Sequence, residues 1–371
     1  MSRILLVSKP LEPPWNDSSK NLVRDLALGL ERHGARALGR KGGPRELGRV
    51  EIEPIHPGRS TGAAGGFSSG LSEQGRVLYR LLRGERAALW HFFFAPNPKT
   101  SLAARAAARA RGVRTLQTVC SVPKTSADLG KVLFAERVVV LSRHTEQRFL
   151  DAGIERERVV RIPPAVPPLE VLGPEARRSA REMFRLPESA TVVLYPGDLE
   201  FGSGALLSVE AHARLPPDTW LVLACRAKTA RAAGTERELR LRAERLGTAA
   251  RIVFTGETPR ILDLVGAADI VVLPSEVAYA KMDYPLVLLE AMALARPVVV
   301  ALGTPAAELA EGGGALAVAP AAEPLAQALL GLAGDETARS ELGARAREAA
   351  LHDYARTKMA RAYEQLYDEL L

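Results

Sequence analysis

The chain has 371 residues, of which 47% are hydrophobic and 25% are charged. This balance excludes a disordered chain and is typical of a globular protein, and at about 150 residues per domain the length predicts two domains. No apolar run reaches the roughly 20 residues that cross a bilayer, so we expect a cytoplasmic protein. The two cysteines, Cys120 and Cys225, lack any ligand-like spacing, which excludes a disulfide framework and a thiolate-rich metal site.

The charge is distributed unevenly along the chain. The net charge is +7, but residues 1–168 carry 28 Lys and Arg against 15 Asp and Glu, whereas residues 169–371 carry 22 against 28. A composition bias toward arginine would act on both halves. The asymmetry therefore predicts an anionic partner for the N-terminal half, either a phosphorylated acceptor or the inner face of a membrane. The alternative is an ordinary solvated basic face.

The first half alternates short apolar runs with helical periodicity, which is typical of parallel sheets with crossover helices. Residues 4–7 are expected to form a strand, and the Pro-rich loop after it leads to a helix that begins at Asp17 or Ser18 and stops at Gly34. The further expected elements are strand 88–94, helix 100–110, strand 113–119, strand 137–141 and helix 144–150. This order predicts a doubly wound domain.

Residues 161–174 hold five prolines and separate two regions that can each bury a core, so we interpret them as a linker. The second half is a more regular repeat. Its expected strands are 191–195, 220–225, 251–254, 270–273 and 297–301, and its expected helices are 204–214, 236–246, 260–267, 285–295 and 325–333. Residues 336–371 are expected to form one or two helices with an apolar face that must pack on another element.

Two segments of the second half suggest ligand binding. Gly202-Ser203-Gly204 follows a strand and opens a helix, so its amides could meet a phosphate. Glu290 lies in the otherwise apolar helix PLVLLEAMALA, and burying an unpaired charge is costly, so this carboxylate either faces a polar ligand in a crevice or lies on an exposed stripe. A Walker lysine loop, H-E-x-x-H and Asp-x-Asp are absent, so we expect no metal held by the protein.

Several stretches of the sequence resemble the family 4 (GT4) glycosyltransferases. The family pattern PSxxExFGLVLLEAMAxGxPVV is similar to PS followed by YPLVLLEAMALARPVVV in this chain. The family's first strand and glycine loop resemble the stretch YPGDLEFGSGALLSVEAHARL. The family's AD-x-x-v-x-PS segment resembles RIVFTGETPRILDLVGAADIVVLPS. In the first half, ERVVVLSRHTEQRFLDAGIERERVVRIPPAV follows the family outline. The resemblance covers most of the chain in order and spacing.

The resemblance implies an α/β protein with the GT-B fold, in which two Rossmann-like doubly wound domains face each other across a cleft. Residues 1–168 would bind the acceptor, residues 169–355 would bind a nucleotide-sugar donor, and residues 356–371 would form a helix that packs back on the N-terminal domain. It also implies a retaining transfer of a hexose, with a UDP- or GDP-sugar as co-substrate and a glycan or lipid-linked acceptor. No other cofactor and no nucleic-acid partner is expected.

The resemblance also assigns donor-binding residues. Glu290 would be the second acid of the family's E-x7-E pair and would bind the donor ribose, and Gly256 and Glu257 would lie near the base. Tyr284, Pro285, Leu286 and Val287 would lie near the diphosphate. The glycine loop would contribute Gly197, Asp198, Ser203 and Gly204.

The first acid of the family pair falls on Met282 in this chain. Asp283 and Glu276 lie close enough in the loop to substitute, and we take Asp283 as a catalytic candidate. Cys120 stands where the family often has a histidine. His91, near the end of the strand WHFFF, is a second catalytic candidate, as a base or a positioning group; the alternative is a packed core histidine.

Asp198 and Ser203 stand where the family usually has an arginine and a lysine, so two phosphate cations are missing. A diphosphate leaving group gathers negative charge as its bond breaks, so a working site needs replacements. We expect Arg226 and Lys228, at the carboxyl edge of a strand, to be these relocated phosphate ligands. The alternative is that both are solvated loop charges.

The residues that open the first expected helix are the acceptor-side candidates, because they follow the first strand at an edge where α/β proteins bind ligands. They are Asn16, Asp17, Ser18, Ser19 and Lys20. The alternative is an ordinary helix N-cap.

The sequence therefore favours a metal-independent, retaining glycosyltransferase that acts in lipid-linked glycan or polysaccharide synthesis, peripheral to the inner membrane face. The missing family residues leave a second hypothesis, a non-catalytic GT-B protein that is a partner or regulator of an active glycosyltransferase. Binding of a nucleoside diphosphate distinguishes the two.

Overall fold

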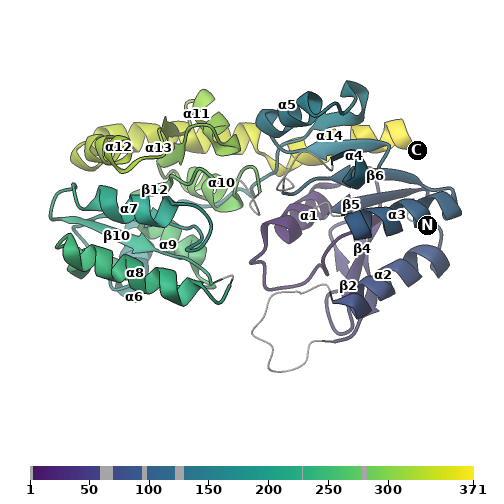
Figure 1. Cartoon of the computed structure of the whole chain (residues 1–371), viewed down its shortest axis with the longest axis horizontal. Helices are drawn as coiled ribbons and strands as arrows, with labels where there is room; N and C mark the ends of the chain where they lie inside the picture. The colour runs from purple at the N-terminus through teal and green to yellow at the C-terminus, as the bar shows by residue number, and fades with distance from the viewer. Residues whose placement is uncertain (1–2, 59–69, 94–97, 122–128, 228, 278–281) are drawn as a thin grey trace. The chain divides into compact units, whose positions relative to one another are not determined.

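The computed structural model describes residues 3–58, 70–93, 98–121, 129–227, 229–277 and 282–371. The chain divides into two compact units (Figure 1). The first unit comprises Met1–Ala165, Tyr279–Tyr284 and Arg356–Leu371, and the second comprises Val166–Ala278 and Pro285–Ala355. Among the described residues, no helix is both long and apolar enough to cross a bilayer.

The first unit contains an eight-stranded sheet in the order β3-β4-β2-β1-β5-β6-β7-β8. All neighbouring strands pair in parallel except β3 with β4. The strands are β1 (Ile4–Val7), β2 (Ala35–Arg40), β3 (Glu46–Leu47), β4 (Val50–His56), β5 (Leu89–Phe93), β6 (Arg114–Thr118), β7 (Arg137–Val140) and β8 (Val159–Arg161). The helices are α1 (Ser18–Gly29), α2 (Leu71–Arg83), α3 (Pro98–Arg111), α4 (Leu129–Val132), α5 (Arg143–Asp151) and α14 (Arg356–Leu370).

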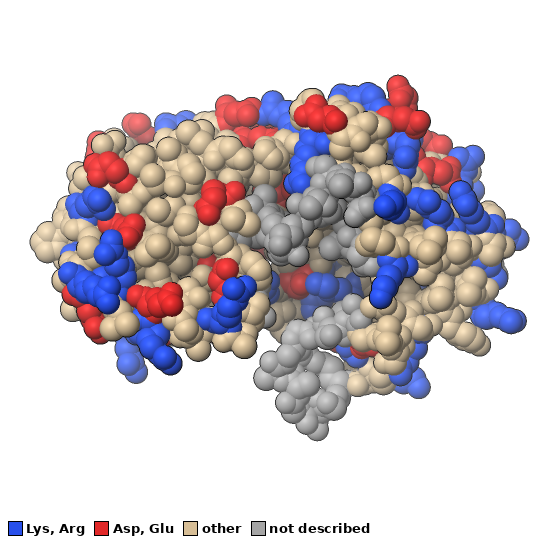
Figure 2. Space-filling view, viewed as in Figure 1, with Lys and Arg blue, Asp and Glu red and all other residues tan. Residues whose placement is uncertain are grey.

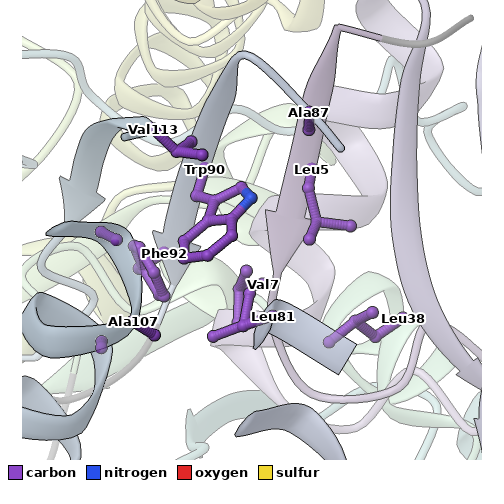
Figure 3. Packing of buried hydrophobic residues seen from close by; sticks show 11 residues of the cluster. Leu5, Val7, Leu38, Leu81, Ala87, Trp90, Phe92, Ala107 and Val113 are labelled. Carbon is purple, nitrogen blue, oxygen red and sulfur yellow. The ribbon is translucent and has the colours of Figure 1, made fainter. Parts of the chain in front are cut away.

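The core of this unit lies between the sheet and the helices α2 and α3 (Figure 3). Trp90 and Phe92 project from β5 on the same side as Leu5 of β1 and meet Ala107 of α3. Residues two apart on a strand share a face, so this side of β5 is aromatic and apolar. Both faces of β5 are covered, because all five of its residues are buried.

Helix α14 belongs to the first unit, although it is the last helix of the chain (Figure 1). It packs on α1, where a Cβ added to Gly29 would lie 2.8 Å from the Cβ of Ala360. The buried carboxylate of Glu364 accepts hydrogen bonds from the backbone N–H groups of residues 31–33. These bonds fix a bend in the chain just after α1, which explains why the helix ends at Gly29 and not at the predicted Gly34.

The second unit contains a six-stranded, wholly parallel sheet in the order β11-β10-β9-β12-β13-β14. Its strands are β9 (Thr191–Tyr195), β10 (Thr219–Leu223), β11 (Ile252–Phe254), β12 (Ile270–Leu273), β13 (Val298–Ala301) and β14 (Leu316–Val318). Its helices are α6 (Pro174–Met183), α7 (Gly204–His212), α8 (Ala232–Arg245), α9 (Ile261–Ala267), α10 (Leu286–Ala293), α11 (Glu308–Glu311), α12 (Ala322–Gly334) and α13 (Glu336–Asp353).

The two parallel sheets with crossover helices confirm the predicted α/β class. The strands β1, β9 and β12 have the predicted bounds. The elements β2, β4, α2 and α6 were not predicted. In the second unit, the topology brings the ends of β9, β10, β11 and β12 to one edge of the sheet, which is where the predicted donor residues lie.

Candidate functional site

The glycine loop after β9 is shaped by close packing on Tyr195. A Cβ added to Gly197 would lie 2.3 Å from the Tyr195 ring, and one added to Gly204 would lie 2.8 Å from its hydroxyl oxygen. Only glycine fits at such distances. The Tyr195 hydroxyl donates a hydrogen bond to the backbone oxygen of Asp198 at 3.0 Å, and burial raises the pKa of this tyrosine well above its usual range. The loop is thus held on a buried, neutral side chain.

The end of this loop touches the segment that follows β12. Gly202 has a φ of +86°, and a Cβ there would lie 2.4 Å from the Ser275 hydroxyl. Ser203, the residue before α7, donates its hydroxyl to Glu276 at 2.6 Å and its backbone N–H to both carboxylate oxygens at 3.3 Å. Two of the loops at this edge are therefore joined by a carboxylate.

The loop after β10 carries the predicted cations. A single parallel β-bridge joins the backbone of this loop to the glycine loop, between Arg226 and Asp198. Asp198 is buried and Arg226 is half-buried. Lys228 lies outside the described residues. In the same loop, Thr229 donates its backbone N–H to Glu200 at 2.8 Å.

The loop after β11 holds Gly256, whose φ is +66°, followed by the exposed Glu257. A Cβ at Gly256 would meet no atom within 4 Å, so the positive φ and not crowding is what favours glycine there.

Helix α10 places Glu290 at the partly exposed side of an apolar helix. The helix begins at Leu286 with Pro285 as its N-cap. Val287 and Glu290 are half-buried, whereas Leu289 and Ala291 are fully buried. Positions three apart share a helix face, so Val287 and Glu290 form one narrow accessible stripe. The carboxylate can meet a polar ligand there without being taken wholly out of water.

At the carboxyl edge of the first unit's sheet, Asp17 is the N-cap of α1 and accepts the N–H of Lys20. Lys9, just after β1, lies 2.5 Å from the Asp17 carboxylate. Burial opposes ionisation of Asp17 and raises its pKa. The positive charge of Lys9 and the hydrogen bonds from Lys9, Ser19 and the Lys20 amide outweigh this effect and lower the pKa of Asp17 to about 2. The ammonium of Lys20 donates to the backbone oxygens of Glu12 and Pro14, which ties down the Pro-rich loop.

The remaining acceptor-side candidates, Asn16 and Ser18, lie beside this cap; Asn16 is exposed and Ser18 is half-buried. The cap thus has the structural role that the sequence left open, and its exposed rim stays a candidate for the acceptor.

Asp283 also lies in the first unit, where it is only 4% exposed. Ser142, the N-cap of α5, donates its hydroxyl to Asp283 at 2.6 Å. Burial raises the pKa of the neighbouring Cys120 thiol to about 12, and the carboxylates of Asp17 and Asp283 act in the same direction. The carboxyl ends of β1, β6 and β7 therefore bring together Asp17, Cys120, Ser142 and Asp283. The Cys120 thiol stays protonated there.

The structure does not support His91 as a catalytic base. Its ring is completely buried, with Nδ1 2.8 Å from the Tyr367 hydroxyl and Nε2 2.8 Å from Thr118 Oγ1. Burial lowers the pKa of His91 well below its usual range. Both nitrogens are used within the unit, so we correct the assignment: His91 is a packed core histidine that links β5 to β6 and α14.

Sequence reasoning missed Lys9 and Ser142 and did not pair Glu276 with Ser203. Lys9 and Ser142 each lie two positions beyond the end of a strand of the parallel sheet, and that position was a usable signal. No local pattern could have paired Glu276 with Ser203, because 73 positions separate them.

Residues 176–349 match the family model described as "Glycosyl transferases group 1". The whole chain is similar in structure to Anabaena Alr3699/HepE in complex with UDP-glucose, with 18% identity, a TM-score of 0.78 and complete coverage of both chains. Sucrose-phosphate synthase from Thermosynechococcus elongatus is also similar, with 19% identity, a TM-score of 0.75 and coverage of 100% of this chain and 99% of that one.

A glycosyltransferase from Rickettsia africae is similar too, with 17% identity, a TM-score of 0.74 and coverage of 99% of this chain and 98% of that one. No curated protein sequence matches the chain. The structural similarity extends over the full length of the chain, so it establishes the GT-B fold. The family model covers the second unit from α6 into α13.

Proposed function

We propose that this chain is a group 1 glycosyltransferase that transfers a hexose from a nucleoside-diphosphate sugar to an acceptor hydroxyl, with retention of configuration and without a metal held by the protein. The family model covers the part of the second unit in which β9, β10, β11, β12 and α10 bring their loops and Glu290 to the sheet. That UDP-glucose is bound in the Anabaena protein supports a nucleotide sugar as donor here.

The observation that carries the proposal is the position of Glu290. It is a carboxylate on a half-buried stripe of an otherwise buried helix, and the loop before this helix starts at the carboxyl end of β12. A carboxylate at such a place accepts hydrogen bonds from two vicinal hydroxyls, as a ribose offers. Glu290 would hold the ribose, Gly256 and Glu257 the base, and the amides of Leu286 and Val287 a phosphate.

Arg226 and Lys228 would supply positive charge to the departing diphosphate. Arg226 follows β10, the strand beside β9, so it emerges next to the glycine loop. Asp198 and Ser203 of the glycine loop are not cations, and Arg226, whose backbone pairs with Asp198 in the loop after β10, would compensate for them.

A thermal-shift screen with UDP, GDP, ADP and their hexose conjugates tests the proposal. Ligand in excess of its dissociation constant raises the melting temperature by mass action, so one nucleotide should stabilise the chain and its sugar conjugate should be turned over to the free diphosphate. Glu290→Gln should lose the shift, whereas Glu341→Gln, an exposed carboxylate of α13, should keep it. A chain that no nucleotide stabilises would be a non-catalytic GT-B protein.

The proposed acceptor is a lipid-linked or polysaccharide intermediate at an anionic membrane surface, and the exposed residues of α2 and α3 support that location. Helix α2 buries only Arg80 and Leu81, while Leu71 is 89% and Tyr79 is 70% exposed. On α3, which packs beside α2, Leu102 is 66% exposed. Exposed apolar side chains among cations suit the headgroup region of anionic lipid.

Figure 2 shows Lys and Arg side chains over the visible face of this unit. The same two helices carry exposed cations, among them Arg76 and Arg83 on α2 and Lys99 and Arg109 on α3. Each cation near an anionic surface contributes about 1 kcal/mol, and the attraction falls with salt. This is the basis for a peripheral location.

Sedimentation with phosphatidylglycerol vesicles tests this surface. Binding should fall steeply between low and high salt, and the double substitution Leu71→Ser and Tyr79→Ser should weaken it. Leu206→Ser, an exposed leucine of α7 in the second unit, is the matched control and should have no effect. Equal binding by all three proteins, or none at low salt, would contradict a membrane role.

A further inference from the structure

The N-terminus of α7 is occupied by a side chain of the protein itself. Ser203 directs its N–H and its hydroxyl at the carboxylate of Glu276, at 3.3 Å and 2.6 Å. The first N–H groups of a helix have no partner within the helix and lie at its positive end, so they favour an anion. Glu276 therefore supplies the negative charge that a phosphate would bring to the same amide.

The position of Glu276 is fixed by the residues on both sides of it. A Cβ at Gly202 would lie 2.4 Å from Ser275 Oγ and 3.3 Å from Val277 Cβ, so both neighbours of Glu276 pack directly on the glycine loop. Ser275 is buried. The backbone on either side is thus held against the loop, which leaves the intervening carboxylate next to Ser203.

The charge around this edge is unusual for a diphosphate site. Among the described residues of these loops, Asp198, Glu200 and Glu276 are acidic, and the backbone of the cationic residue Arg226 pairs with that of Asp198. Glu200 accepts both the N–H and the hydroxyl of Thr229, at 2.8 Å and 3.2 Å. Two loop amides that could face a phosphate are therefore each bonded to a glutamate, and like charges repel an incoming diphosphate.

We propose that Glu276 is an internal competitor of the donor's diphosphate and sets the affinity for the donor. The inference rests on the proposed function. In the free protein Glu276 holds the Ser203 amide and hydroxyl; when the donor binds, a phosphate oxygen takes these bonds and the carboxylate moves away. The donor must displace a charge-assisted contact, so the affinity is lower than the same loop would give with a neutral residue at position 276.

Isothermal titration with UDP tests this, with uridine as the ligand that lacks phosphate. A charge-assisted hydrogen bond contributes enough that Glu276→Gln should bind UDP about tenfold more tightly than the natural protein, with uridine affinity unchanged. Glu341→Gln removes a negative charge from exposed α13 and should bind both as the natural protein does. Equal or weaker UDP binding by Glu276→Gln would overturn the inference and leave the proposed function intact.

Absence of UDP or any other nucleoside diphosphate binding in all variants would instead refute the proposed function, and this inference with it. Binding by Glu276→Gln alone would support both. A crystal structure of the natural protein with UDP is the second test and needs no variant. It should show a phosphate oxygen bonded to the Ser203 N–H and the Glu276 carboxylate displaced; UDP bound with the Ser203 to Glu276 bonds retained would overturn the inference.

Discussion

Ser142 and Asp283 are 141 positions apart in the sequence, and the Ser142 hydroxyl donates a 2.6 Å hydrogen bond to the Asp283 carboxylate in the buried carboxyl edge of the first sheet. Ser142 also accepts the N–H of Thr145 at the start of α5. The serine therefore ties the segment that leads into α10 to the cap of a helix in the first unit. Asp283, the candidate to substitute for the missing first acid of the family pair, is thus also a buried anchor, and its catalytic role stays a prediction.

Asp283→Asn should destabilise the protein by about 1 kcal/mol, because the amide oxygen can still accept the Ser142 hydroxyl but the buried hydrogen bond is no longer charge-assisted. It should also reduce turnover, since Pro285 to Val287 follow directly in the chain. Urea unfolding and nucleoside-diphosphate release measure the two effects. Glu155→Gln, an exposed acid beyond α5, is the control and should change neither. Full stability of Asp283→Asn would show that the anchor is unimportant.

Gly197→Ala tests the shape of the glycine loop. The added Cβ would lie 2.3 Å from the Tyr195 ring, so the loop must shift, which we expect to cost about 1–3 kcal/mol of stability and to weaken donor binding. Gly234→Ala on α8 meets no atom within 4 Å and should raise stability by about 0.5–1 kcal/mol. Melting temperatures and UDP titration of the pair provide the comparison, and equal behaviour would contradict the packing argument.

His91 should affect the pH dependence of stability and not the chemical step. Its folded-state pKa lies well below 6.5, so the unfolded chain takes up a proton first as the pH falls. Stability present above pH 6.5 is then lost on acidification, by about 1.4 kcal/mol per pH unit for each such histidine. His56 and His212 act in the same direction, and the pKa of His212 is lowered to about 4.

His91→Gln should therefore flatten, but not abolish, the fall in unfolding free energy between pH 7 and pH 5. Its kcat at pH 7.5, measured well below the melting temperature, should match that of the natural protein. A large loss of kcat with KM unchanged would restore His91 as a catalytic group.

Regular apolar strands could be predicted from the sequence and polar edge elements could not. The strands β1, β9 and β12 are continuous apolar runs, so their bounds were predicted correctly. The strands β2 and β4 contain Arg36, Glu51 and Pro54 and lie toward one edge of the sheet, where a polar pattern does not distinguish a strand from a loop. Helix α2 was missed because it follows a glycine-rich stretch and buries little.

The donor side of the site could be predicted from family-like motifs, but the contacts that control it could not. The Ser203 to Glu276 and Ser142 to Asp283 bonds join segments that are distant in the sequence. Nor could the sequence place His91, because its partners Thr118 and Tyr367 come from β6 and α14. Tertiary contacts decided each of these roles.

The most direct test of the account compares the preferred nucleoside diphosphate with its 2′,3′-dideoxy analogue, for the natural protein and for Glu290→Ala. If Glu290 holds the ribose hydroxyls, the natural protein should bind the analogue at least tenfold more weakly, because a charge-assisted hydrogen bond is lost. Glu290→Ala should bind both ligands equally. An equal penalty for the analogue in both proteins, or failure of the natural protein to bind any nucleoside diphosphate, would contradict the account.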